Sequence, residues 1–105
     1  MNLNGWLLMK RMNPSIKLEK INGIIKSRGV SHGGWQENMD NTAALWSHFL
    51  GIQISSWQVC VMLCLLKVSR MTCGGKFNID DFDDHVGYAA MAAACAENEK
   101  KEKEV

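Results

Sequence analysis

The sequence contains little that would interrupt a helix and little that would form a sheet. Pro14 is the only proline among the 105 residues, so the rest of the chain lacks the residue that breaks helices most strongly. No useful length of chain alternates apolar and polar residues, which argues against half-buried strands. Alanine, leucine, methionine, glutamate and lysine are frequent and favour helix. We therefore expect an all-α fold.

Segments that would target the chain to a membrane or to secretion are also missing. The longest apolar run, VCVMLCLL at residues 59–66, is far shorter than the roughly 20 residues of a membrane helix. The apolar stretch WLLM at residues 6–9 is too short for the core of a signal peptide. The four cysteines lack the close C-x₂-C pair of most zinc sites. We expect reduced thiols and a cytoplasmic location without membrane contact.

The charge balance excludes a strong electrostatic field. The formal net charge is +1 and 22% of the residues are charged. The sequence shows no basic patch, so we expect no nucleic-acid partner. A chain of this length forms one domain with or without tails. We expect an N-terminal extension at 1–14, a helical domain at 15–98 and a charged flexible tail at 99–105.

Apolar periodicity and helix-capping residues predict a compact bundle of about four helices. Their expected ranges are 16–28, 35–50, 56–71 and 80–98. Ser15 is the expected cap of the first helix and Gly29 its stop, with the glycine-rich stretch 28–35 as a loop.

The third predicted helix is apolar nearly all round, which requires cover on most of its sides. Such a helix is either central in the bundle or part of a subunit interface. We expect a homodimer or larger oligomer with the third and fourth helices near its centre.

Two cations and several acids flank the turn between these two helices. Lys67 and Arg70 are three residues apart and therefore neighbours on one helix surface. Asp80 and Asp84 share a face of the next helix, which Tyr88 continues. Either this is a pocket in which the cations hold phosphate, or Arg70 and Asp84 form a structural clamp. We favour the clamp and keep the ligand site as the alternative.

Two further features suit a charged ligand. Asp81 and Asp84 form a D-x-x-D pair, which fits a divalent cation such as Mg²⁺. The glycine-rich stretch offers Arg28, His32 and backbone N–H groups just before a helix, which favours an anion. No catalytic residue is identified, because no Cys or Ser is spaced from a His in the way that a nucleophile and its base require.

Five motifs stand in a distinctive order. They are R-G-x-x-H-G at 28–33, Asn38, A-L-W at 44–46, L-K-x-x-R at 66–70 and D-x-x-x-D-x-x-G-Y-A at 80–89. This order, covering roughly residues 20–95, resembles a family of small bacteriophage and prophage proteins of unknown function. The resemblance adds Asn38 to the ligand-binding candidates. In that family an acidic residue usually follows the His-Gly pair, where this chain has Gly34.

The chain is also faintly similar to the all-α nucleoside triphosphate pyrophosphohydrolases of the MazG type, which hold magnesium with E-E-x-x-E and E-x-x-D. The stretch QENMD, with Gln36 and Asp40 in two glutamate positions, echoes the first motif, and Asp81 with Asp84 echoes the second. The similarity implies a nucleotide or other phosphate ligand and a degenerate pyrophosphohydrolase. The alternative is a non-catalytic interaction protein that acts on a host or phage factor.

Overall fold

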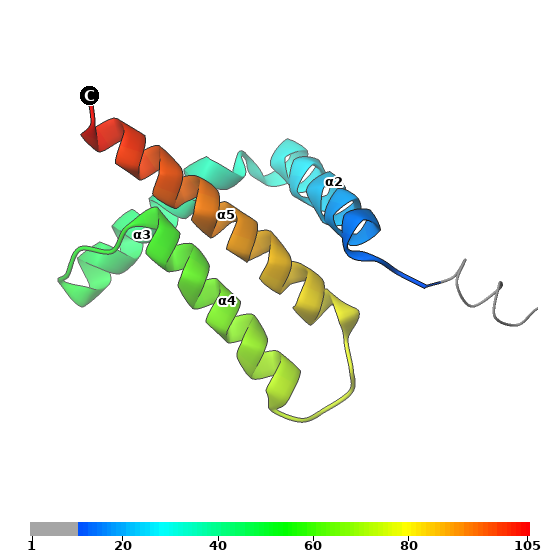
Figure 1. The fold of residues 1–105 in the computed structure, drawn as a ribbon. Helices are drawn as coiled ribbons and strands as arrows, with labels where there is room; N and C mark the ends of the chain where they lie inside the picture. The colour runs from blue at the N-terminus through cyan, green and yellow to red at the C-terminus, as the bar shows by residue number, and fades with distance from the viewer. Residues whose placement is uncertain (1–10) are drawn as a thin grey trace, which may run out of the picture.

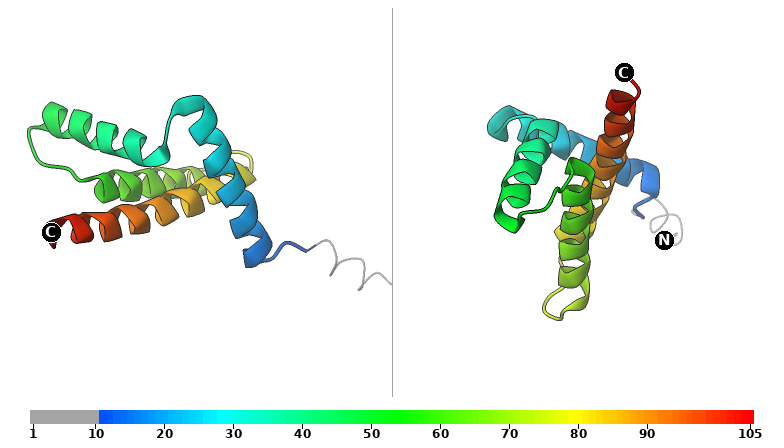
Figure 2. Two further views of the ribbon diagram at one scale, coloured as in Figure 1. Left: turned by 90° about the horizontal axis from the view of Figure 1, so that it is seen from above. Right: turned by 90° about the vertical axis from the view of Figure 1, so that its left-hand side faces the viewer.

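The computed structural model describes residues 11–105, with the side chains of Ser31 and His32 left aside. The elements are α2 (Pro14–His32), α3 (Trp35–Leu50), α4 (Ser56–Thr72) and α5 (Ile79–Lys103). Helices α3, α4 and α5 run alternately up and down beside one another, and α2 crosses α5 at one end of this group (Figures 1 and 2). Over residues 11–105, the predicted all-α fold of four packed helices is confirmed.

The start and end of α2 differ from the prediction. Asn13, and not Ser15, is the N-cap: its Oδ1 accepts a hydrogen bond from the backbone N–H of Ile16 at 2.9 Å, and Pro14 takes the first helical position. Proline suits that position because its missing N–H would have no helical partner there. Gly29 does not stop the helix, which continues to Gly33, where φ is 82°. The expected loop at 28–35 is therefore mostly helix.

The limits of α3 and α4 agree with the prediction to within a residue. Gly51 ends α3 with φ of 70°, a left-handed conformation that glycine adopts without strain. A capping box begins α4, in which Gln58 Oε1 accepts from the N–H of Ser55 at 2.9 Å. Between them, Ser47 Oγ accepts from the N–H of Ile54 at 2.8 Å and fixes the connection.

Helix α5 is longer than expected. Asn78 caps it, and the helix continues to Lys103, past the predicted end at 98. The expected N-terminal extension lies for the most part at 1–10, outside the described residues, and the domain limits stay a prediction.

The core sits where α4 meets its two neighbours. Val59 and Cys60 of α4 are fully buried. Val59 belongs to a cluster with Ala43 of α3 and Ile54 of the connection, flanked by the half-buried Met39, Trp46 and Leu63. On the other side, Cys60 lies near Cys95 of α5. Burial and the nearby Cys95 raise the pKa of the Cys60 thiol to about 12. The four cysteines are free thiols.

Candidate functional site

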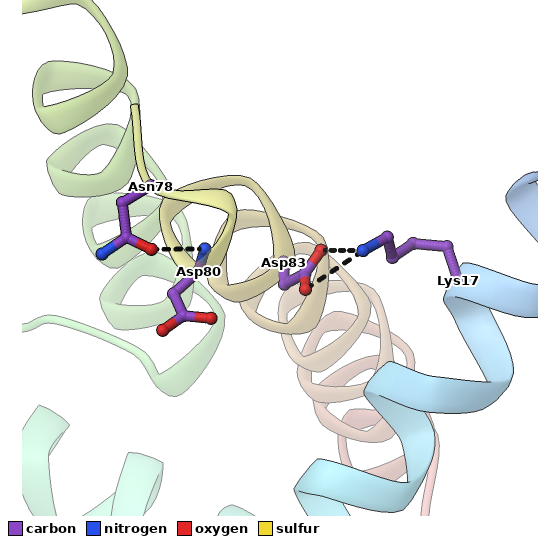
Figure 3. A network of polar contacts seen from close by, with 4 residues as sticks. All are labelled: Lys17, Asn78, Asp80 and Asp83. Carbon is purple, nitrogen blue, oxygen red and sulfur yellow. Dashed lines mark hydrogen bonds and ion pairs between the residues drawn. The ribbon is translucent and has the colours of Figure 1, made fainter. Parts of the chain in front are cut away.

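An ion pair between two residues that are 66 positions apart in the sequence joins α2 to α5. Lys17 Nζ lies 3.0 Å from Oδ1 and 3.2 Å from Oδ2 of Asp83, whose residue is only 7% exposed (Figure 3). One turn further along α5, Gly87 leaves room for Ile21 and Ile25 of α2 to pack against the helix. A Cβ added at Gly87 would be in ordinary van der Waals contact with these two side chains, so the space between the helices admits a methyl group.

Asp84 of α5 contacts a cation on α4 and another on α2. Its Oδ2 lies 2.9 Å from Lys67 Nζ, and its Oδ1 lies 4.0 Å from Arg28 Nη2. The predicted clamp between Arg70 and Asp84 is wrong: Lys67, one turn earlier, takes that place and keeps only 11% of its side chain exposed. Arg70, three residues further along α4, is exposed.

A cavity of about 170 Å³ opens between α2, α3 and α5 beside these ion pairs. Its apolar wall consists of Ile21, Ile24, Ile25, Met39 and Met91. Trp35 and Tyr88 add aromatic rings, and Arg28, Asn38 and Asp84 add polar groups. Apolar walls with a few placed polar groups are typical of small-molecule sites.

The cavity gathers half of the ligand-binding candidates predicted from the sequence. Arg28, Asn38, Asp84 and Tyr88 line it, and Lys67 reaches its edge through Asp84. Arg70 and Asp80 do not line it. The Asp80 carboxylate points away from the Lys17–Asp83 pair, at the capped start of α5 (Figure 3). His32 lies in the last turn of α2, and its side chain is not described.

Three residues of this site were missed from the sequence: Lys17, Trp35 and Asp83. A periodic signal was available for two of them. Lys17, Ile21, Ile25 and Arg28 recur at spacings of four, four and three, which places them on one face of a helix. Asp83 and Gly87 share a face of α5 for the same reason. What the spacing does not reveal is that these two faces meet.

Asp84, one of the two residues proposed for a metal, lies between two cations. Asp84 is held by Lys67 and Arg28, and these charges compete with a divalent ion for the same carboxylate. Within residues 11–105, excluding the side chains left aside, no group of three or more His, Cys, Asp or Glu is placed to hold a metal ion.

The two motifs that echo MazG-type enzymes lie far apart: QENMD is on α3 beside the C-terminal half of α5, and Asp81 with Asp84 is near the start of α5. Gln36 Nε2 donates to Asp40 Oδ1 at 2.9 Å and to Cys95 Sγ at 3.4 Å, and Asn98 Nδ2 donates to Gln36 Oε1 at 3.2 Å. Cys95 is eleven residues beyond Asp84 along α5, or roughly 16 Å at the rise of a helix. The similarity to these enzymes remains a prediction.

Comparisons with known proteins agree with the phage resemblance. The "Gene 55 protein" of Mycobacterium phage D29 is 33% identical over 78 residues, which cover 74% of this chain and 51% of that protein. The chain thus spans about half the length of this curated relative. No solved structure gives a significant match. None of the helices in the described part of the chain is both long and apolar enough to cross a membrane.

The match to a protein family covers most of the helical region. The model of the domain of unknown function DUF6378 matches residues 17–96, a span that begins at Lys17 and takes in α3, α4 and most of α5. It therefore includes the three ion pairs of the site and every wall of the cavity. The chain belongs to the DUF6378 family.

Proposed function

We propose that the cavity between α2, α3 and α5 binds a small molecule that carries a flat ring and a phosphate, that is, a nucleotide. The observation that carries this proposal is the meeting of Trp35, Tyr88 and Arg28 at one cavity. A dry apolar cavity of about 150 Å³ takes a benzene-sized ring, so the 170 Å³ here suits one ring system.

Different side chains of the site suit the two parts of the ligand, the base and the phosphate. The rings of Trp35 and Tyr88 offer stacking surfaces for a base, and Asn38 and Asp84 make part of the cavity wall polar. Arg28 keeps 61% of its side chain exposed at the rim. A guanidinium in that position suits a phosphate that remains in solvent.

The proposed activity is binding, with slow or absent turnover. Asp83 and Asp84 are both engaged by cations, and a carboxylate held in this way is a poor base for activating water. Magnesium enters the proposal only as a counter-ion to the phosphates outside the cavity, where it keeps most of its own waters.

A titration of the full chain with deoxynucleoside triphosphates, with and without Mg²⁺, tests the proposal. Amide shifts should concentrate on residues 24–39 and 83–91, which line the cavity. Arg28→Gln should weaken binding of the triphosphate by about 10-fold, the loss of one charge-assisted contact of about 1.5 kcal/mol. Arg70→Gln is the matched control and should leave binding unchanged. The absence of shifts at millimolar nucleotide refutes the proposal.

A second candidate function is that of a non-catalytic interaction protein acting on a host or phage factor. It is favoured by the exposed apolar side chains where α3 ends, Leu45, Phe49, Leu50 and Ile52. The same titration separates the two functions, because an interaction surface at this end predicts no nucleotide shifts at the cavity.

A further inference from the structure

Helix α4 carries its charge on the inside and its apolar residues on the outside. Lys67 is the only charged residue from Ser56 to Ser69, and its ammonium is turned inward to Asp84. Trp57, Val61, Leu65 and Val68 are exposed, Leu65 to 61%. Spaced by four, four and three residues, they lie along one face of the helix.

No other described helix lies on the side of α4 that faces away from α3 and α5 (Figures 1 and 2). A solvent-facing helix surface normally carries charged and polar residues. This surface has no charged residue over almost four turns. An uncharged face does not suit a partner that is recognised through ion pairs. It suits another apolar helix.

We propose that this face of α4 packs antiparallel against the same face of a second copy of the chain. A two-fold axis close to residues 62 and 63 brings Trp57 to the level of Val68 of the other copy, and Val61 to within about one residue, roughly 1.5 Å, of Leu65. Each pair sets a larger side chain against a smaller one, so the row is complementary to itself. Antiparallel helices also oppose their dipoles favourably.

The flanking residues supply the remaining area. The face of α4 is about 25 Å long and 10 Å wide, well below the roughly 800 Å² that each partner contributes to a standard interface. Phe77 and Phe82 are exposed beyond the C-terminal end of α4, with ring centroids 5.7 Å apart. In the antiparallel arrangement this pair comes beside Trp57 of the second copy, so the contact continues onto the start of α5.

Sedimentation equilibrium tests the state of assembly. The full chain at about 50 µM should be a dimer, a concentration that reveals any dissociation constant in the low micromolar range. Leu65→Glu and Val61→Lys should each weaken dimerisation by at least 10-fold while leaving the helical circular dichroism unchanged, since both side chains already face solvent. Val30→Lys, at a side chain 91% exposed on α2, is the control and should remain dimeric.

Mixing the two variants tests the register. In the proposed arrangement position 61 faces position 65 of the other copy, so an equimolar mixture of Leu65→Glu and Val61→Lys should form a heterodimer. A monomeric wild-type chain overturns the proposal, as does a dimer that neither variant disrupts. If both variants are monomeric and the mixture is too, the antiparallel register is wrong.

Discussion

Asp83 and Asp84 are neighbours in the chain, yet their carboxylates serve different helices. Asp83 binds Lys17 of α2, and Asp84 binds Lys67 of α4. Consecutive residues on a helix are about 100° apart around its axis, so one pair of adjacent acids reaches in two directions. At the scale of single residues, this pair ties α2 and α4 to α5.

Removing the partner of Asp83 should destabilise the fold. Lys17→Met leaves a buried carboxylate without its cation, which costs about 1–3 kcal/mol. Lys26→Met, at an exposed lysine of the same helix, should change the free energy of unfolding by less than about 0.5 kcal/mol. Urea denaturation of the two variants measures the difference. Equal losses in both would show that the Lys17–Asp83 pair adds no stability.

Lys67 and Arg70 should differ sharply, although they are of like charge and one turn apart. Lys67→Met removes the cation that pairs with Asp84 from α4, and it should lower the free energy of unfolding by about 1–3 kcal/mol. Arg70→Gln changes an exposed side chain and should fall within about 0.5 kcal/mol of wild type. Thermal or urea unfolding decides, and a larger effect at Arg70 would restore the clamp predicted from the sequence.

Cys60 makes the stability depend on alkaline pH. Burial and the nearby Cys95 raise the pKa of its thiol from 9.0 to about 12. A pKa raised by folding gives stability that is complete below the unfolded pKa and is lost as the pH rises toward the folded one. The free energy of unfolding should therefore fall between pH 9 and 12, by up to about 1.4 kcal/mol per pH unit. Cys60→Ala should fall less steeply over this range, and parallel curves would remove Cys60 as the cause.

At the scale of helices, the crossing of α2 and α5 depends on Gly87. A Cβ added there would lie 3.6 Å from Ile21 Cγ2 and 3.9 Å from Ile25 Cδ1, which is ordinary van der Waals contact. The glycine is therefore not needed to avoid a clash with a methyl group. A side chain larger than a methyl group would have to push the two helices apart.

Two substitutions at Gly87 should act in opposite directions. Gly87→Ala should stabilise the protein by about 0.5–1 kcal/mol, because alanine is the better helix former and its methyl fits. Gly87→Leu should destabilise it by about 1–3 kcal/mol by forcing α2 away from α5. Gly23→Ala, with nothing within 4 Å of the added carbon, controls for helix propensity alone. Destabilisation by Gly87→Ala would mean that the helices pack more tightly than described.

The helices that the sequence predicts best are those with strong caps. Gly51 and Ser55 set the limits of α3 and α4 because a left-handed glycine and a capping box are local signals. The end of α2 is missed because Gly29 has the composition of a breaker but adopts helical geometry. Four candidate residues do meet at the cavity. The ion pairs beside the cavity could not be assigned from the sequence. Lys17 and Asp83, for example, lie 66 residues apart, and local periodicity carries no information about contacts over such a separation.

At the scale of the whole molecule, the described residues form a well-packed group, α3 to α5, and a less embedded helix, α2. The buried residues Ala43, Val59, Cys60 and Cys95 all belong to the first group, while α2 contributes Ile21. Helices with few buried apolar side chains open locally at lower free energy than the core. The cavity therefore lies between the most and the least stable parts of the fold.

Native-state hydrogen exchange should resolve this difference. Amides in the middle of α2 should exchange through an opening of lower free energy than those of α4, and Lys17→Met should accelerate exchange in α2 alone. A ligand in the cavity should slow α2 selectively, since it binds only when α2 is docked. Equal opening free energies for α2 and α4 would show a single cooperative unit.

The two-glycine connection between α2 and α3 makes α2 a lever with its pivot at Gly33. Lys17 lies sixteen residues from that pivot, roughly 24 Å along the helix, and Arg28 only about 8 Å from it. A rotation of about 10° would move Lys17 by roughly 4 Å and Arg28 by little more than 1 Å at these lever lengths. The Lys17–Asp83 pair thus acts with the greatest mechanical advantage, and it resists a swing of α2 that the Arg28–Asp84 contact would barely sense.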